Sequence, residues 1–203
     1  MLSTTLAVPV NPCCVSGAIH EGTAQGTVQQ INGLDVYVTG DVANKVSNSQ
    51  LFVCRFERKS TISRSDVDPT FSRQNRTIVY LTDIFGWSLI NSRLLADELA
   101  SHGFYVLIPD IFQGDSLDHS ILFQLAPRDS APLRSAEQIA SETEIALGQV
   151  GPWLIRKRPE VTQPLIESFV KALREDSSIG KIGAAGYCWG GRYSILLADG
   201  QVE

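Results

Sequence analysis

A strand, a sharp turn and a helix follow one another without a gap in KIGAAGYCWGGRYSILLADG, residues 181–200. The apolar, glycine-rich residues 181–188 predict a strand, and residues 190–200 predict a helix. The turn between them is Gly-Tyr-Cys-Trp-Gly, with Cys188 at its tip. A strand that passes directly into a helix is typical of folds in which helices cover a parallel sheet.

The rest of the chain repeats this alternation of strands and helices. Residues 1–32 are rich in Gly, Ser and Thr, and we expect them to be extended or loop-like. In the last helix before Cys188, Thr162 is the expected N-cap and Pro164 lies in the expected first turn. The sequence therefore predicts one α/β domain over residues 1–203, with a mostly parallel sheet. The expected strands are 34–40, 77–83, 104–112 and 181–188, and the expected helices are 88–103, about 136–147, 162–176 and 190–200.

Residues 45–76 interrupt the alternation. They are polar, rich in Ser and Arg, and lack a convincing strand or helix period. Long structureless connections are unusual inside a compact domain. We therefore expect a disordered insert here.

Charge and cysteine spacing exclude several function classes. The net charge is −5 and no basic patch stands out, so nucleic acid is not an expected partner. No apolar run approaches the roughly 18 residues of a membrane span, and the N-terminus lacks the basic start of a signal peptide. The four cysteines, at 13, 14, 54 and 188, have no zinc-type spacing. Cys13 and Cys14 together with His20 also lack the spacing of a metal site. These features predict a cytosolic, reduced protein without a metal or cofactor.

The turn at Cys188 has the form of a nucleophile elbow, with cysteine in the place of serine. Gly186 and Gly190 keep β-carbons away from the crowded flanks of such a turn. A helix that begins after Cys188 favours thiolate, and the amide of Trp189 is placed to bind a developing oxyanion. Two simpler interpretations remain: a glycine-rich turn that binds phosphate, or a cysteine that only fills space.

A second turn follows the expected strand 77–83, in LTDIFG (81–86). The amide of Ile84 would be the second oxyanion donor that this architecture takes from an earlier strand-to-helix loop. Asp83 precedes it and is a candidate catalytic acid. The alternative for Asp83 is a carboxylate that caps the helix after the turn.

Together, GYCWGG, LTDIFG, ASHGFYVLIPDIFQGD (100–115) and CCVSGAIHEGTAQG (13–26) resemble the dienelactone hydrolase family, and within it the fungal branch. Members of that family are α/β-hydrolases that open lactones or cleave small esters through a cysteine. The resemblance implies Cys188 as nucleophile and the amides of Ile84 and Trp189 as oxyanion donors. It also implies that the acid before Ile84 holds or deprotonates the thiol. That acid is often Glu in the family, and Asp83 is shorter by one methylene.

The resemblance further implies a small ester or lactone as substrate. Some family substrates carry a carboxylate, which calls for arginine in the pocket. The sequence does not choose among the candidates Arg128, Arg134, Arg156, Arg158 and Arg192.

A hydrolase of this chain order needs an Asp and then a His after the nucleophile. Residues 189–203 contain Asp199 but no histidine, and His20, His102 and His119 all precede Cys188. We therefore expect a truncated α/β-hydrolase-like sheet that lacks its C-terminal strands. Strand 181–187 then lies at an edge, where self-association is possible.

These features predict a cysteine hydrolase of small esters or lactones, impaired by the lack of a downstream Asp and His. The alternative is a non-catalytic binding or dimerisation fragment of the same fold. A nucleotide-binding protein is disfavoured, because neither G-x-G-x-x-G after the first strand nor G-x-x-x-x-G-K-[ST] is present.

Overall fold

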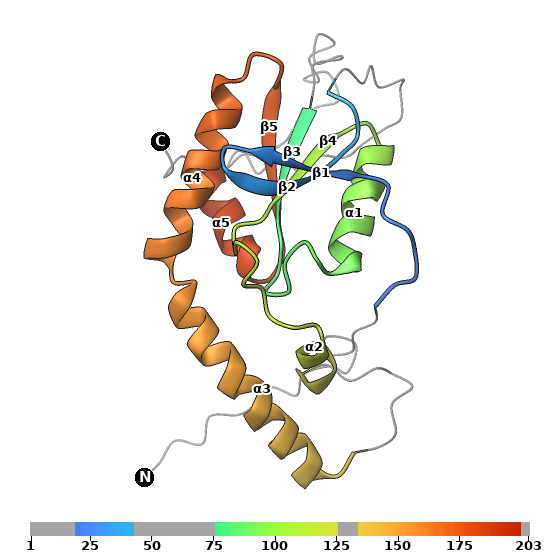
Figure 1. The fold of residues 1–203 in the computed structure, drawn as a ribbon, viewed down its shortest axis with the longest axis vertical. Helices are drawn as coiled ribbons and strands as arrows, with labels where there is room; N and C mark the ends of the chain where they lie inside the picture. Colours follow the sequence, from blue (N-terminus) through green and yellow to red (C-terminus); the bar gives the residue numbers. More distant parts are fainter. Residues whose placement is uncertain (1–18, 43–75, 126–133, 200–203) are drawn as a thin grey trace, which may run out of the picture.

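The structure is a computed structural model that describes residues 19–42, 76–125 and 134–199. Its five strands form one sheet in the order β1-β2-β4-β3-β5 (Figure 1). β3 pairs in parallel with both β4 and β5, whereas β2 pairs antiparallel with β1 and β4. The expected α/β fold is confirmed, with a parallel centre and an antiparallel side. The strands are β1 (Thr27–Ile31), β2 (Leu34–Thr39), β3 (Arg76–Leu81), β4 (Tyr105–Pro109) and β5 (Lys181–Gly186).

Helices cover both faces of the sheet (Figure 1). Side chains alternate along each strand, so that Val79 faces α4 and α5 while Tyr80 faces α1. α3 continues away from the sheet and packs on α2. None of the described helices is long and apolar enough to span a bilayer. The helices are α1 (Ile90–Ser101), α2 (Ser120–Leu125), α3 (Ala136–Arg156), α4 (Pro159–Glu175) and α5 (Trp189–Ala198).

Residues 1–32 were expected to be extended or loop-like, and within them the extended part is β1, which forms a hairpin with β2. Asn32 and Gly33 connect the two strands with positive φ values of 50° and 76°. Positive φ at both positions is the geometry of a tight hairpin turn, and Asn-Gly is its preferred sequence. The signal was therefore present in the sequence, although the polar residues of β1 concealed it.

Both long helices differ from their predicted bounds. α3 does not end near 147 but continues to Arg156. α4 begins at Pro159 with Arg158 as its N-cap, so the expectation that Thr162 caps the helix is wrong. Thr162 is instead buried inside α4, where its hydroxyl lies 2.9 Å from the hydroxyl of Tyr193 in α5.

β5 lies at the edge of the described sheet, as the sequence predicts. Its one partner strand among the described residues is β3. The expected insert at 45–76 lies outside the described residues, except for Arg76, which is the first residue of β3 rather than part of the insert.

Candidate active site

The turn at Cys188 has the backbone of a strained bend. Cys188 has φ 51° and ψ −113°, between the end of β5 and the start of α5. A positive φ is rare for a residue with a side chain, and such strain persists only where the surroundings enforce it. The thiol is free and exposed. The bend therefore presents the sulfur to solvent at the N-terminus of a helix.

The bend at Cys188 requires glycine at positions 186 and 190, because neither position has room for a β-carbon. A β-carbon on Gly190 would lie 2.1 Å from the carbonyl oxygen of Leu81, and one on Gly186 would lie 2.3 Å from that of Gly190. Neither glycine has a positive φ. Their role is therefore close backbone approach rather than conformational freedom.

The same close approach joins the bend to the end of β3. The amide of Tyr187 donates to the carbonyl of Leu81 (3.2 Å), and that of Gly190 donates to the carbonyl of Thr82 (3.0 Å). Asp83 and Ile84 come directly after these acceptors. The structure therefore brings Cys188 and the Asp83–Ile84 turn to the same end of the sheet, where β3 and β5 finish.

Asp83 stabilises its own turn. Its Oδ1 accepts a hydrogen bond from the amide of Phe85 (2.9 Å), and its carbonyl accepts one from the amide of Gly86 (3.1 Å). α1 begins only at Ile90, with Leu89 as N-cap, so the alternative that Asp83 caps this helix is wrong. Burial raises the pKa of the Asp83 carboxyl above its ordinary value, and the Phe85 amide and His119 oppose that rise.

This raised pKa predicts how Asp83→Asn changes stability with pH. The folded chain binds the Asp83 proton more tightly than the unfolded chain, so ionisation costs folding free energy as pH rises. We expect Asp83→Asn to become progressively more stable than the native chain from about pH 3.8 upward, through the raised pKa of Asp83. Urea unfolding at a series of pH values measures the difference. A gain that is constant with pH, or that shrinks as pH rises, would contradict this assignment.

His119 also lies at this turn, which its place in the sequence did not predict. Its Nε2 lies 3.3 Å from the Ser88 hydroxyl, and its ring meets that of Phe85 edge-on at 6.2 Å between centroids. Nearby, the amide of Leu117 donates to the carbonyl of Ile84 (3.0 Å). Residues 117–119 therefore hold the loop that carries Asp83 and Ile84. By contrast, His102 ends α1 and contacts Glu98.

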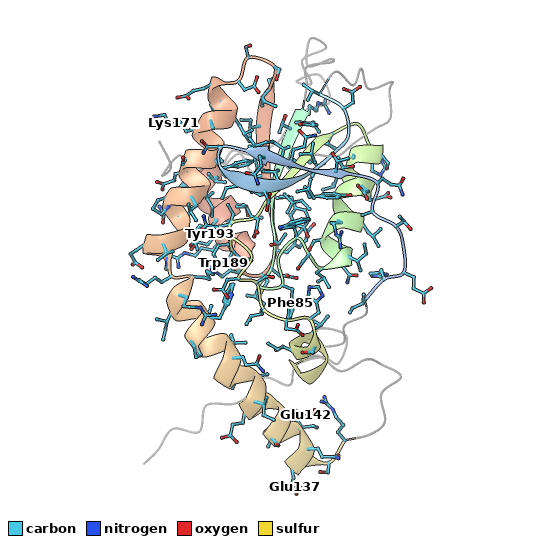
Figure 2. All side chains as sticks on the ribbon, viewed as in Figure 1. Phe85, Glu137, Glu142, Lys171, Trp189 and Tyr193 are labelled. Carbon is cyan, nitrogen blue, oxygen red and sulfur yellow. The ribbon has the colours of Figure 1, made fainter. Side chains whose placement is uncertain are left out.

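The two residues that carry the candidate oxyanion-donor amides pack against one group of buried side chains, which we call the tryptophan cluster. Ile84 and Trp189 pack against it, and Figure 2 shows Trp189 beside Tyr193 and above Phe85. The Trp189 ring centroid lies 4.8 Å from that of Phe112 and 4.4 Å from that of Tyr193. Trp189 is also the first residue of α5, so its amide has no acceptor within the helix. The buried residues of the cluster are Phe85, Leu89, Phe112, Leu117, Ile121, Ala146 and Trp153.

The candidate arginines have other described contacts. Arg134 pairs with Glu142, and Arg156 pairs with Asp115 at 3.1 Å. Arg158 lies 3.7 Å from Glu160, and the Arg192 guanidinium lies 5.8 Å from the Tyr193 ring centroid. Arg128 lies outside the described residues.

The described residues hold no cluster of metal-ligating side chains, and two cavities of the described part of the chain lie away from the Cys188 turn. Residues 19–42, 76–125 and 134–199 contain no group of three acids, cysteines or histidines placed to hold a metal ion. One cavity of about 360 Å³ lies among β5, α4 and α5, and another of about 380 Å³ lies beside the β1–β2 hairpin. Neither is lined by Cys188, Asp83 or Ile84.

Comparison with known proteins shows the family to which this chain belongs. The model of the dienelactone hydrolase family matches residues 66–203, more than half of the chain. The chain belongs to the dienelactone hydrolase family. The match includes both turns of the candidate site, and it begins inside the segment 45–76.

Three relatives illustrate the extent of this family likeness. Hydrolase pyvD of Aspergillus violaceofuscus is 30% identical, and the alignment covers 97% of this chain and 60% of that protein. Hydrolase tropI of Talaromyces stipitatus is 25% identical, with 97% and 61% covered. A carboxymethylenebutenolidase homolog of Xenopus tropicalis is 29% identical over 62% of this chain and 42% of its own length. The chain thus spans about 60% of the length of these two fungal hydrolases.

Proposed function

We propose that the chain is a cysteine hydrolase of small esters or lactones, with Cys188 as nucleophile. The observation that carries the proposal is the exposed Cys188 thiol at a left-handed bend directly before α5, in a member of the dienelactone hydrolase family. The sulfur lies at the N-terminus of α5, where the positive end of the helix dipole can stabilise negative charge that develops during the reaction. Because a thiolate nucleophile must stay reduced, the proposal also places the protein in the cytosol.

In the proposed acylation, the Cys188 sulfur attacks the ester carbonyl carbon, and the carbonyl oxygen takes up the negative charge. The amides of Ile84 and Trp189 donate to that oxygen. The carbon–oxygen bond to the leaving group then breaks, the alkoxide takes the proton that the thiol gave up, and a thioester on Cys188 remains. Asp83, whose raised pKa makes its carboxylate a better base, accepts the thiol proton in the resting protein.

Deacylation is the slow step in this proposal. Water must attack the thioester, and a histidine usually removes its proton. No histidine follows Cys188 in the 203 residues, and His119 contacts Ser88 and Phe85. A general base contributes roughly 10²–10⁴ in rate. We therefore expect this chain to acylate faster than it deacylates.

The test uses p-nitrophenyl acetate and the intact chain. We expect a burst of one p-nitrophenolate per chain, then turnover near that of a free thiol, with the acetyl group on the peptide that contains Cys188. Cys188→Ala removes the burst, while Cys13, Cys14 and Cys54 serve as internal references for mass spectrometry. Acetylation of Cys188 no faster than of these cysteines would overturn the nucleophile assignment. Rapid turnover that depends on Cys188 would overturn only the slow deacylation.

A non-catalytic binding fragment is the second candidate. The observation that favours it is the edge position of β5, where backbone groups on one side can pair with another strand. An unreactive Cys188 in a folded chain would favour this alternative.

A further inference from the structure

The loop 83–88 carries two groups of the proposed reaction, the Asp83 carboxylate and the Ile84 amide. The planar peptide bond between these two residues points the Asp83 carbonyl and the Ile84 N–H in opposite directions. That carbonyl accepts a hydrogen bond from the Gly86 amide within the turn (3.1 Å), so the Ile84 N–H points away from the turn. None of the described residues accepts a hydrogen bond from the Ile84 N–H. The orientation of the loop therefore decides where this donor points.

His119 is connected to the other end of this loop by two successive hydrogen bonds. The Ser88 hydroxyl has one proton, which it donates to the Phe85 carbonyl (3.3 Å). His119 Nε2 lies 3.3 Å from the same hydroxyl oxygen, so the ring N–H donates to that oxygen. The neutral ring with its proton on Nε2 and the imidazolium can both make this bond. His119 thus holds the loop backbone through Ser88.

The residues beside His119 anchor it to the core. The amide of Leu117 donates to the Ile84 carbonyl (3.0 Å), and the His119 ring meets the Phe85 ring edge-on. Leu117 and Phe85 are both buried in the tryptophan cluster. Figure 2 shows Phe85 next to α2, the short helix that directly follows His119. The loop is therefore held by a buried contact as well as by the hydrogen bond to Ser88.

His119 also lies within electrostatic reach of the second reacting group. Burial raises the pKa of the Asp83 carboxyl, while the Phe85 amide and positive charge on His119 oppose that rise. A protonated His119 therefore favours the Asp83 carboxylate. The other charged or titratable groups at this loop are Tyr80, Arg93 and Asp118.

We propose that His119 is a positioning residue for the reaction at Cys188, which holds the loop 83–88 through Ser88 and adds positive charge beside Asp83. The inference rests on the proposed function and assigns a residue that the acylation steps do not include. The held loop directs the Ile84 N–H at the oxyanion, as a preorganised donor requires. His119 acts through these groups and forms no bond to the ester.

Two reagents separate the oxyanion donors from the reactivity of the sulfur. p-Nitrophenyl acetate transfers its acetyl group to the sulfur through an intermediate whose oxyanion needs the Ile84 N–H. Iodoacetamide alkylates the same sulfur by displacing iodide, and no oxyanion forms in that reaction. The ratio of the two rate constants at Cys188, measured by mass spectrometry at one alkaline pH, therefore reports the oxyanion donors. A general loss of stability does not change this ratio selectively.

Variants at both ends of the hydrogen bond test the positioning role. His119→Phe keeps a ring against Phe85 and removes the donor to Ser88, whereas Ser88→Ala removes the hydroxyl. We expect each variant to lower the ratio of acetylation to alkylation roughly tenfold, because the loop then holds its donor less precisely. Both changes break one connection, so the double variant should fall no further. His102→Gln, at the exposed end of α1, should leave the ratio unchanged.

His119→Gln separates charge from hydrogen bonding. The glutamine amide can still donate to the Ser88 hydroxyl but carries no charge. Without the positive charge of His119, the Asp83 pKa should rise further, so the carboxylate that accepts the thiol proton forms at a higher pH. We expect the acid limb of the alkylation rate at Cys188 to move to higher pH in His119→Gln. The limb should stay in place in Ser88→Ala and His102→Gln.

The outcomes distinguish this inference from the function on which it rests. A native ratio in both His119→Phe and Ser88→Ala overturns the positioning role, and an acid limb that His119→Gln leaves in place overturns the role of the charge. Either result leaves the proposed function standing, because the native chain alone decides that question. A native Cys188 that reacts no faster than the other three cysteines would overturn the proposed function, and this inference with it.

Discussion

Gly190→Ala is expected to lower the free energy of unfolding by about 3 kcal/mol or more. The added methyl would lie 2.1 Å from the Leu81 carbonyl oxygen and 2.6 Å from that of Thr82. Both are backbone atoms, so no flexible side chain can move aside. The clash would also disturb the hydrogen bond from the Gly190 amide to Thr82 (3.0 Å). Urea unfolding followed by circular dichroism measures the loss.

Two other glycines in helices serve as controls for Gly190. A β-carbon at Gly191 would have its nearest contact at 3.5 Å, and one at Gly148 would have none within 4 Å. Because Ala favours helix over Gly by about 1 kcal/mol, we expect Gly148→Ala to be neutral or stabilising. A Gly190→Ala variant as stable as Gly191→Ala would show that the bend and β3 are not packed as described.

Trp153→Ala is expected to cost about 3–5 kcal/mol, the usual range for a fully buried aromatic residue. Trp153 is 0% exposed, and its ring centroid lies 4.9 Å from that of Phe112. Its indole N–H donates to the Asp115 carbonyl (2.6 Å), so truncation also leaves that acceptor without its partner. Denaturant unfolding measures the cost.

Trp153→Phe separates packing from hydrogen bonding at this position. It keeps an aromatic ring and loses the donor, so we expect a smaller loss than for Trp153→Ala. Since Trp189 packs on the same cluster, Trp153→Ala should also slow acetylation of Cys188. A Trp153→Ala chain with native stability would contradict the assignment of Trp153 to the core.

The elements around the candidate site were predictable because their signals are local. The run before Cys188 forms β5 and the run after it forms α5, and the crowding at Gly186 and Gly190 explains both glycines. Within the described sheet, β5 also lies at the edge, as the sequence predicts. The roles of Cys188, Asp83, Ile84 and Trp189 stay predictions.

The bounds of α3 and α4 were not predictable because distant contacts decide them. Gly148, Gly151 and Pro152 favour an end to α3, yet the buried Trp153 and its hydrogen bond to Asp115 hold the helix together to Arg156. Thr162 has the local features of an N-cap, but its hydroxyl lies beside Tyr193, 31 residues away. The position of His119 at the Asp83 turn likewise follows from tertiary packing, not from spacing in the sequence.

The position of Trp189 next to Cys188 gives the protein an intrinsic fluorescent probe. Trp189 adjoins Cys188 in sequence and is only partly buried, and the chain has three tryptophans in all. Replacing Trp87 and Trp153 by phenylalanine would leave a single indole fluorophore next to the sulfur. Its emission would then follow each modification of that sulfur in real time, without any coloured or attached label.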